Sequence, residues 1–127
     1  MSKNAEFFIP GKLPGFNEII SSAKIKKGRG SRYEKEKREI TFFLCGIIKA
    51  EKVSKFRKCR IGFRWVEPDR KRDIDNISAG KKYILDALVW AGVIADDSWK
   101  CVRGFLQEEF YCDRRNPGVW VRLEEVD

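Results

Sequence analysis

The sequence predicts an α+β fold: a small mixed β-sheet with two main helices, in the order β-α-β-α-β-β. Two stretches place apolar residues three and four apart, as one face of a helix requires, while shorter stretches alternate or cluster them as strands do. The chain has 127 residues, of which 43% are hydrophobic and 36% charged. This length suits a single domain over residues 1–127, and this composition suits a packed core.

The first half of the chain predicts a strand, a loop and a long helix. The apolar run Phe7–Ile9 is halted by Pro10, which is typical of an edge strand. A basic loop is expected at about residues 21–32, and Ser31 can cap a helix that continues to about Lys52. The apolar face of that helix consists of Ile40, Phe43, Leu44, Ile47 and Ile48.

The second half predicts a strand, a second helix and two late strands. Residues 61–65 alternate apolar side chains with Arg or Gly, the period of a strand with one buried face, and Pro68 ends it. The second helix is expected from Asn76 to Trp90. The late strands are expected within residues 100–111 and at residues 119–123, with a turn-rich segment between them.

The charge distribution points to a polyanionic partner. The chain carries a formal net charge of +8, and residues 24–38 hold eight Lys or Arg against two Glu, a net +6 (8 − 2) of that total. Nucleic acid is the commonest partner of a small basic domain, and an anionic membrane surface is the alternative. No apolar run approaches the roughly 20 residues of a membrane span, and the N-terminus lacks a secretory signal. We therefore expect a cytoplasmic protein with no membrane partner.

The absence of histidine restricts the chemistry that is open to this chain. It removes Ser-His-Asp and Cys-His catalysis and histidine-bound zinc. The four cysteines are scattered with no C-x-x-C pair, so we expect thiols in or near the core rather than disulfides or a zinc site. Carboxylates, lysines and metal-bound water must then perform any proton chemistry, and no organic cofactor is expected.

The densest chemical signal is the run Asp69–Asn76, where acidic residues stand among basic ones between a strand and a helix. Asp73 and Asp75 are two apart, so in extended chain they project from one face and could bind one cation between them. Asp96–Asp97 can supply a third carboxylate. Such a metal site would activate a water and neutralise phosphate charge, as phosphodiester hydrolysis without histidine needs. The alternative is that these residues are ordinary helix caps and loop residues.

A helical wheel adds two residues to this cluster. In one continuous helix from Asp75, Lys82 and Asp86 fall within about 20° of it, opposite the apolar stripe. Lys82 is then a candidate to stabilise phosphate charge, whereas Lys81 falls beside the apolar stripe. The alternative for Lys82 and Asp86 is a solvated salt bridge.

With these residues identified, the sequence resembles the RusA family of phage and prophage Holliday-junction resolvases. The resemblance rests on Asp73–Asn76, Lys82–Leu88, Ala91–Ile94 and Asp96–Ser98, in that order, and extends weakly to Pro14–Ile20. The last two ranges form one block, and three linked blocks in order make the resemblance specific. Roughly residues 5–124 are covered.

The resemblance implies a homodimer that makes paired nicks in four-way DNA junctions during DNA recombination and repair. It implies dependence on Mg²⁺, with Mn²⁺ as a substitute, and metal binding by Asp73, Asp75 and Asp97. It also implies catalysis assisted by Lys82, although the stretch from Asn76 to Lys82 is longer here than in the prophage form, which leaves Lys81 as the alternative. The residues expected to support the ligands are Asp86, Asp96 and Asn76.

A basic surface is expected to contact the DNA backbone without reading its sequence. Its candidate residues are Lys24, Lys26, Lys27, Arg29, Arg32, Arg70, Lys71 and Arg72. The stretch at residues 26–31 is expected to be a mobile loop, and the alternative is that it is merely solvated. Two other functions stay open: a non-catalytic architectural dimer that binds DNA without cutting, and a nuclease of flaps or other branched DNA.

Overall fold

The computed structural model describes residues 3–13, 26–27 and 30–127. The elements in chain order are β1 (Asn4–Pro10), β2 (Lys26–Lys27), β3 (Gly30–Ser31), α2 (Arg32–Ala50), β4 (Cys59–Glu67), α3 (Ile74–Ser78), α4 (Lys81–Trp90), β5 (Val102–Cys112) and β6 (Gly118–Glu125). The predicted α+β class, with a mixed sheet and two main helices, is confirmed. The segment from Pro14 to Ile20, which carries the weaker part of the resemblance, lies outside the described residues.

The frame of the molecule is a four-stranded sheet with the spatial order β1-β6-β4-β5. β6 runs antiparallel to both of its neighbours, whereas β4 and β5 run parallel. Strand β1 forms one edge, as the sequence predicts, and β5 forms the other. Strands β2 and β3 form a separate antiparallel pair at residues 26–27 and 30–31, where the sequence predicts only a loop.

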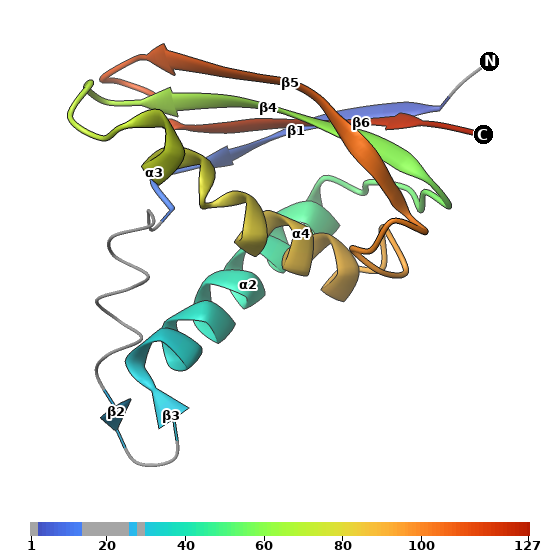
Figure 1. Ribbon diagram of the computed structural model, residues 1–127, viewed down its shortest axis with the longest axis horizontal. Coiled ribbons are helices and arrows are strands. Elements are labelled where there is room, and N and C mark those ends of the chain that lie inside the picture. Colours follow the sequence, from blue (N-terminus) through green and yellow to red (C-terminus); the bar gives the residue numbers. More distant parts are fainter. Residues whose placement is uncertain (1–2, 14–25, 28–29) are drawn as a thin grey trace.

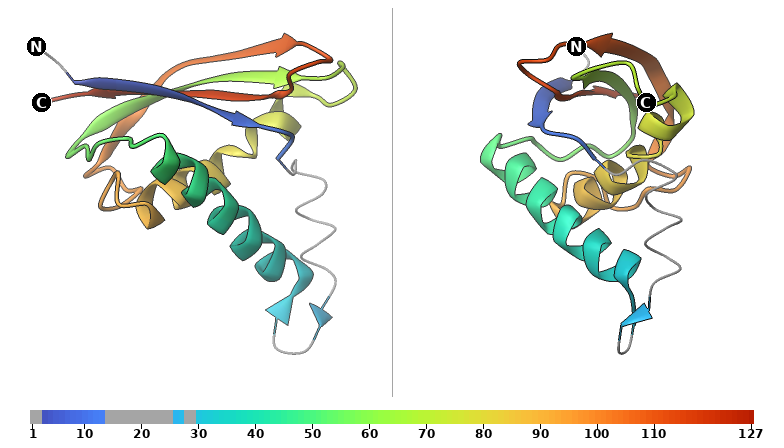
Figure 2. Two further views of the ribbon diagram at one scale, coloured as in Figure 1. Left: turned by 180° about the vertical axis from the view of Figure 1, so that it is seen from behind. Right: turned by 90° about the vertical axis from the view of Figure 1, so that its left-hand side faces the viewer.

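Helices α2 and α4 pack together on one face of the sheet, as the three views agree (Figure 1, Figure 2). The alternation predicted in β4 places Ile61, Phe63 and Trp65 in the core. Helix α2 contributes Leu44 and Ile48 to the same core, which confirms most of its predicted apolar face. The prediction was wrong for Phe43, which is 56% exposed, because α2 turns Thr41, Leu44 and Cys45 toward the core instead.

The second predicted helix is wrong as a single element, because it is divided into α3 and α4 at Ala79–Gly80. Hydrogen bonds from Gly80 N to Ile77 O and from Tyr83 N to Gly80 O span three residues rather than four. A side chain at Gly80 would press on Leu13 and Trp65, with contacts of 3.2 Å to each, so the junction is packed closely against the core. The turn angle of an unbroken helix therefore does not carry from α3 into α4.

All four cysteines are free thiols, as predicted. Cys45, Cys59 and Cys101 are buried, whereas Cys112 is exposed at the end of β5. No helix of the described residues is both long and apolar enough to span a membrane.

Candidate active site

Asp73 and Asp75 lie at the end of the connection from strand β4 to helix α3. Strand β4 ends at Glu67, a loop follows Pro68, and α3 begins at Ile74. Both aspartates are exposed and line one hollow, together with Glu67, Asp69 and Tyr111. The structure thus brings together the two carboxylates that the sequence predicts to share a site.

The side chain of Asp73 does not behave as an ordinary helix cap. It occupies the N-cap position of α3 in extended conformation, yet it makes no capping hydrogen bond. Asp75 accepts a hydrogen bond of 3.0 Å from the main chain of its neighbour Asn76, and α3 is only five residues long. The capping interpretation is therefore not supported for Asp73, and its carboxylate oxygens remain exposed to solvent.

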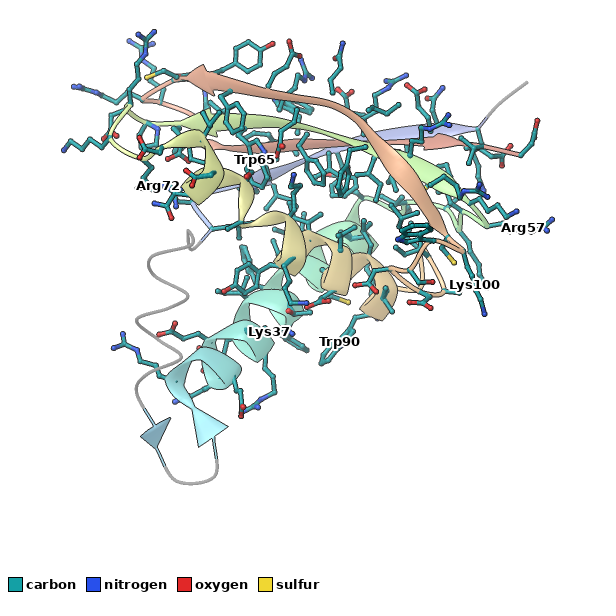
Figure 3. All side chains as sticks on the ribbon, viewed as in Figure 1. Lys37, Arg57, Trp65, Arg72, Trp90 and Lys100 are labelled. Atoms are coloured by element: carbon teal, nitrogen blue, oxygen red, sulfur yellow. The ribbon has the colours of Figure 1, made fainter. Side chains whose placement is uncertain are left out.

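The predicted third carboxylate is in another part of the molecule. Asp97 lines a different hollow, with Trp99 and Arg103 among its neighbours, beyond the C-terminal end of α4. Figure 3 shows Arg72, next to Asp73, and Lys100, three residues after Asp97, at opposite ends of the molecule. Accordingly, the described part of the chain contains no group of three acidic or cysteine side chains that could hold a metal ion.

Asp96 has a local structural role. Its carboxylate accepts a hydrogen bond of 3.1 Å from the main chain of Ser98, which forms the turn after α4. Hydrogen bonds from the side chain and main chain of Ser98 hold the pKa of Asp96 below its usual value. The carboxylate of Asp96 thus stabilises the turn, and both Asp96 and Asp97 are exposed.

The two candidate lysines differ in their surroundings. Lys82 is exposed and forms no ion pair with the described residues. Lys81 is half-buried, its Nζ lies 2.9 Å from Glu108 of β5, and it sits 4.8 Å from the centroid of the Phe105 ring. Glu108 also accepts a hydrogen bond of 2.8 Å from the indole of Trp65, so it fixes both groups.

Asp86 faces α2 rather than the aspartate pair. Its carboxylate lies 3.3 Å from Nζ of Lys37, and both side chains are partly buried. The helical wheel that grouped Asp86 with Asp75 assumed one continuous helix, which the break at Gly80 rules out. An ion pair between α2 and α4 is thus the observed environment of Asp86.

Arg72, which the sequence predicts to contact DNA, has partners within the chain. Its guanidinium forms a two-pronged ion pair with Glu67, with distances of 2.9 and 2.8 Å, and donates a further hydrogen bond of 2.9 Å to the carbonyl of Leu13. Its side chain is only 12% exposed. In the structure the guanidinium of Arg72 is therefore held within the chain, and its contact with DNA stays a prediction.

The other predicted DNA-binding residues divide into three groups. Arg70 and Lys71 are exposed on the loop of the aspartate pair. Arg32 is exposed at the start of α2 and pairs with Glu36 at 2.7 Å. Lys26 and Lys27 form β2, whereas Lys24 and Arg29 lie outside the described residues.

Sequence reasoning missed the roles of Glu67 and Glu108. Glu67 has the same parity in β4 as Ile61, Phe63 and Trp65, and the alternation therefore predicts that it points inward. A buried carboxylate needs a partner, and the basic run Arg70–Arg72 begins three residues later, so the sequence contains a signal for this pair. For Glu108 no comparable local signal exists, since its partners come from β4 and α4.

The fold and the site define a class of protein: a basic, histidine-free α+β domain that presents two exposed aspartates on a loop with exposed basic residues. The comparison with known families is more specific. The family model described as endodeoxyribonuclease RusA matches residues 2–124. The chain belongs to this family, which makes nuclease the class of enzyme that is supported. No curated protein sequence matches the chain.

Proposed function

We propose that this chain is a Mg²⁺-dependent endodeoxyribonuclease that resolves four-way DNA junctions as a homodimer, by paired symmetric nicks. The observation that carries the proposal is the exposed pair Asp73 and Asp75, on a loop that also exposes Arg70 and Lys71. The side chain of Asp73 makes no capping hydrogen bond to α3. Membership of the RusA endodeoxyribonuclease family across nearly the whole chain supports it.

The residues of this loop fit a hard divalent cation. Mg²⁺ prefers carboxylate oxygens and retains several waters, so two aspartates on one loop are a suitable donor set. Bound there, Mg²⁺ or Mn²⁺ would supply a Lewis acid that activates water and neutralises phosphate charge. The aspartates would hold the ion, and the neighbouring Arg70 and Lys71 would draw the phosphate backbone toward it.

The position of Asp97 gives the dimer a function in this proposal. Asp73 and Asp75 line one hollow and Asp97 lines another, and the described residues of one chain contain no group of three carboxylates that could hold one ion. In a dimer with a two-fold axis, the end of α4 near Asp97 in one copy could lie beside the aspartate pair of the other copy. Symmetry would then place the second Asp97 beside the aspartate pair of the first copy. Two identical composite sites would result, which suits paired nicks on symmetric strands.

Lys82 is the residue that we propose to assist catalysis. It is exposed at the first turn of α4, six residues beyond Asn76, and no described acidic group neutralises it. An ammonium in this position can stabilise charge that develops on the phosphate in the transition state. The partnered Lys81 is less suitable, because Glu108 already holds its ammonium.

The test is cleavage of an immobile labelled four-way junction, beside linear duplex and a flap, with Mg²⁺ or with chelator. We expect symmetric Mg²⁺-dependent nicks in the junction alone, lost in Asp75→Asn while junction binding is kept or strengthened, because removing a carboxylate lowers its repulsion of phosphate. Glu39→Gln is the matched control, since it removes one exposed carboxylate from α2. Tight binding without cleavage would establish the architectural alternative, and equal cutting of flap and junction a broader branched-DNA nuclease.

A further inference from the structure

A buried ion pair lies directly behind the aspartate loop. Glu67, at the end of β4, is the one charged side chain among the fully buried residues of the described chain, with 6% of its surface exposed. Its side chain is matched by that of Arg72, which stands immediately before Asp73. A buried carboxylate is costly unless it is paired and hydrogen-bonded, so this arrangement needs an explanation.

The geometry of the pair ties three segments together. Nε and Nη2 of Arg72 donate to the two carboxylate oxygens of Glu67 at 2.9 and 2.8 Å, and Nη1 donates to the carbonyl of Leu13 at 2.9 Å. The main-chain carbonyl of Glu67 also accepts a bond of 2.8 Å from Asp113. The planar fork of Arg72 thus joins the end of β4, the chain after β1 and the loop of the aspartates (Figure 3).

The pair fixes the path of the loop that it spans. Four residues separate Glu67 from Arg72, and Asp73 follows at once, with Asp75 two residues later. Within the loop the main-chain nitrogen of Lys71 donates a hydrogen bond of 3.0 Å to the carboxylate of Asp69. After the loop the carbonyl of Asp73 accepts a bond of 3.1 Å from the main chain of Ile77, which is buried in the core. The guanidinium of Arg72 therefore anchors the chain directly before Asp73, and Ile77 anchors it after Asp73.

We propose that Arg72 and Glu67 are positioning residues, which hold Asp73 and Asp75 in the geometry that binds the metal ion. This inference rests on the proposed metal site. It gives Arg72 a role through the loop, because each of its three nitrogens donates a hydrogen bond within the chain and its side chain is 12% exposed. It also explains the position of Glu67, whose side chain is 8% exposed and therefore too buried to contact DNA.

The test uses Arg72→Lys and Glu67→Gln in the full chain. Lysine keeps the positive charge but cannot form the two-pronged pair, and glutamine keeps the shape of Glu67 but not its charge. The matched control is Arg70→Lys, the same chemical change at an exposed position of the same loop. Three quantities are measured: Mn²⁺ affinity without DNA by electron paramagnetic resonance, junction affinity in chelator, and amide hydrogen exchange of residues 68–78.

For Arg72→Lys and Glu67→Gln we expect Mn²⁺ affinity to fall by at least about tenfold, as for residues that orient metal ligands, with faster exchange in residues 68–78 and unchanged exchange in β6. Junction affinity in chelator should change by less than about twofold, because the positive charge is kept or a buried acid is lost. The control should leave Mn²⁺ affinity and exchange unchanged.

Two outcomes would overturn the inference. Unchanged loop exchange and Mn²⁺ affinity in both variants would show that the pair does not position the aspartates, even if the wild type cleaves junctions. A fall in junction affinity for Arg72→Lys with Mn²⁺ affinity intact would make Arg72 a phosphate contact. If the wild-type protein does not bind Mn²⁺, the proposed metal site itself is overturned. This outcome differs from failure of the positioning inference, because it is seen in the wild type without any variant.

Discussion

A mixed dimer of two inactive variants should recover cleavage if each site takes Asp97 from the partner chain. Carboxylate oxygens that share one Mg²⁺ lie about 2 Å from it, and therefore within roughly 4 Å of one another. The ten residues of α4, which stand between Asp75 and Asp97, alone rise about 15 Å. In a dimer of Asp75→Asn with Asp97→Asn, one site would carry both substitutions and the other would be intact.

Nicking by the purified mixed dimer tests the composite site. The two variants are co-expressed with different tags, the mixed dimer is purified, and nicking of a labelled four-way junction is measured. One intact site of two predicts about half the wild-type nicking rate, with single nicks rather than paired ones. A mixed dimer of Asp73→Asn with Asp75→Asn is the control, because both of its sites are damaged. Native mass spectrometry verifies that the mixed dimers have formed. If the verified dimer of Asp75→Asn with Asp97→Asn does not nick the junction, the composite site is refuted.

Three further predictions concern stability and DNA binding. Burial raises the pKa of the Cys59 thiol from 9.0 to about 11; the unfolded chain then loses this proton first, so stability should fall by roughly 2–3 kcal/mol between about pH 9 and pH 11. Urea unfolding should show this fall, and Cys59→Ala should flatten it; an equal slope in the variant would contradict the cause. Replacing Lys26 and Lys27 by Ala should lower the slope of log affinity against log salt by roughly 2, for every junction sequence alike; an unchanged slope would remove β2 from the DNA contact. Gly118→Ala would place a methyl group on the main-chain oxygen of β1 and should destabilise the protein by more than about 2 kcal/mol, whereas Gly46→Ala in open space on α2 should stabilise it by about 0.5–1 kcal/mol; similar values for the two would refute the packing argument.

Local patterns predicted most of this fold because they record burial directly. The period of two at residues 61–65 and the three-and-four spacing in α2 depend on which face meets the core, and both were confirmed except at Phe43 of α2. The division between α3 and α4 depends instead on contacts of Gly80 with Leu13 and Trp65, which are distant in sequence. Periodicity along one segment carries no information about such contacts.

The candidate site was predictable to the same degree. Asp73 and Asp75 share a hollow because they are close in sequence on one loop, which spacing alone can show. Asp97 lies elsewhere because α4 intervenes, and a wheel cannot show the direction in which the chain leaves a helix. The ion pair of Arg72 with Glu67 was not predicted, because a basic residue beside an acidic site suggests DNA contact, whereas the partner comes from the inward-pointing end of β4.

The choice between the two lysines stays a prediction, but the structure changes the reason for it. Lys82 was preferred because an unbroken helix would align it with Asp75, and the break at Gly80 removes that reason. The ammonium of Lys81, however, is held by Glu108 and covered by aromatic rings, so its movement to a phosphate would leave a half-buried carboxylate unpaired. Lys82 can turn toward a bound phosphate without breaking an ion pair with any described residue, which makes it the less costly source of positive charge in the transition state.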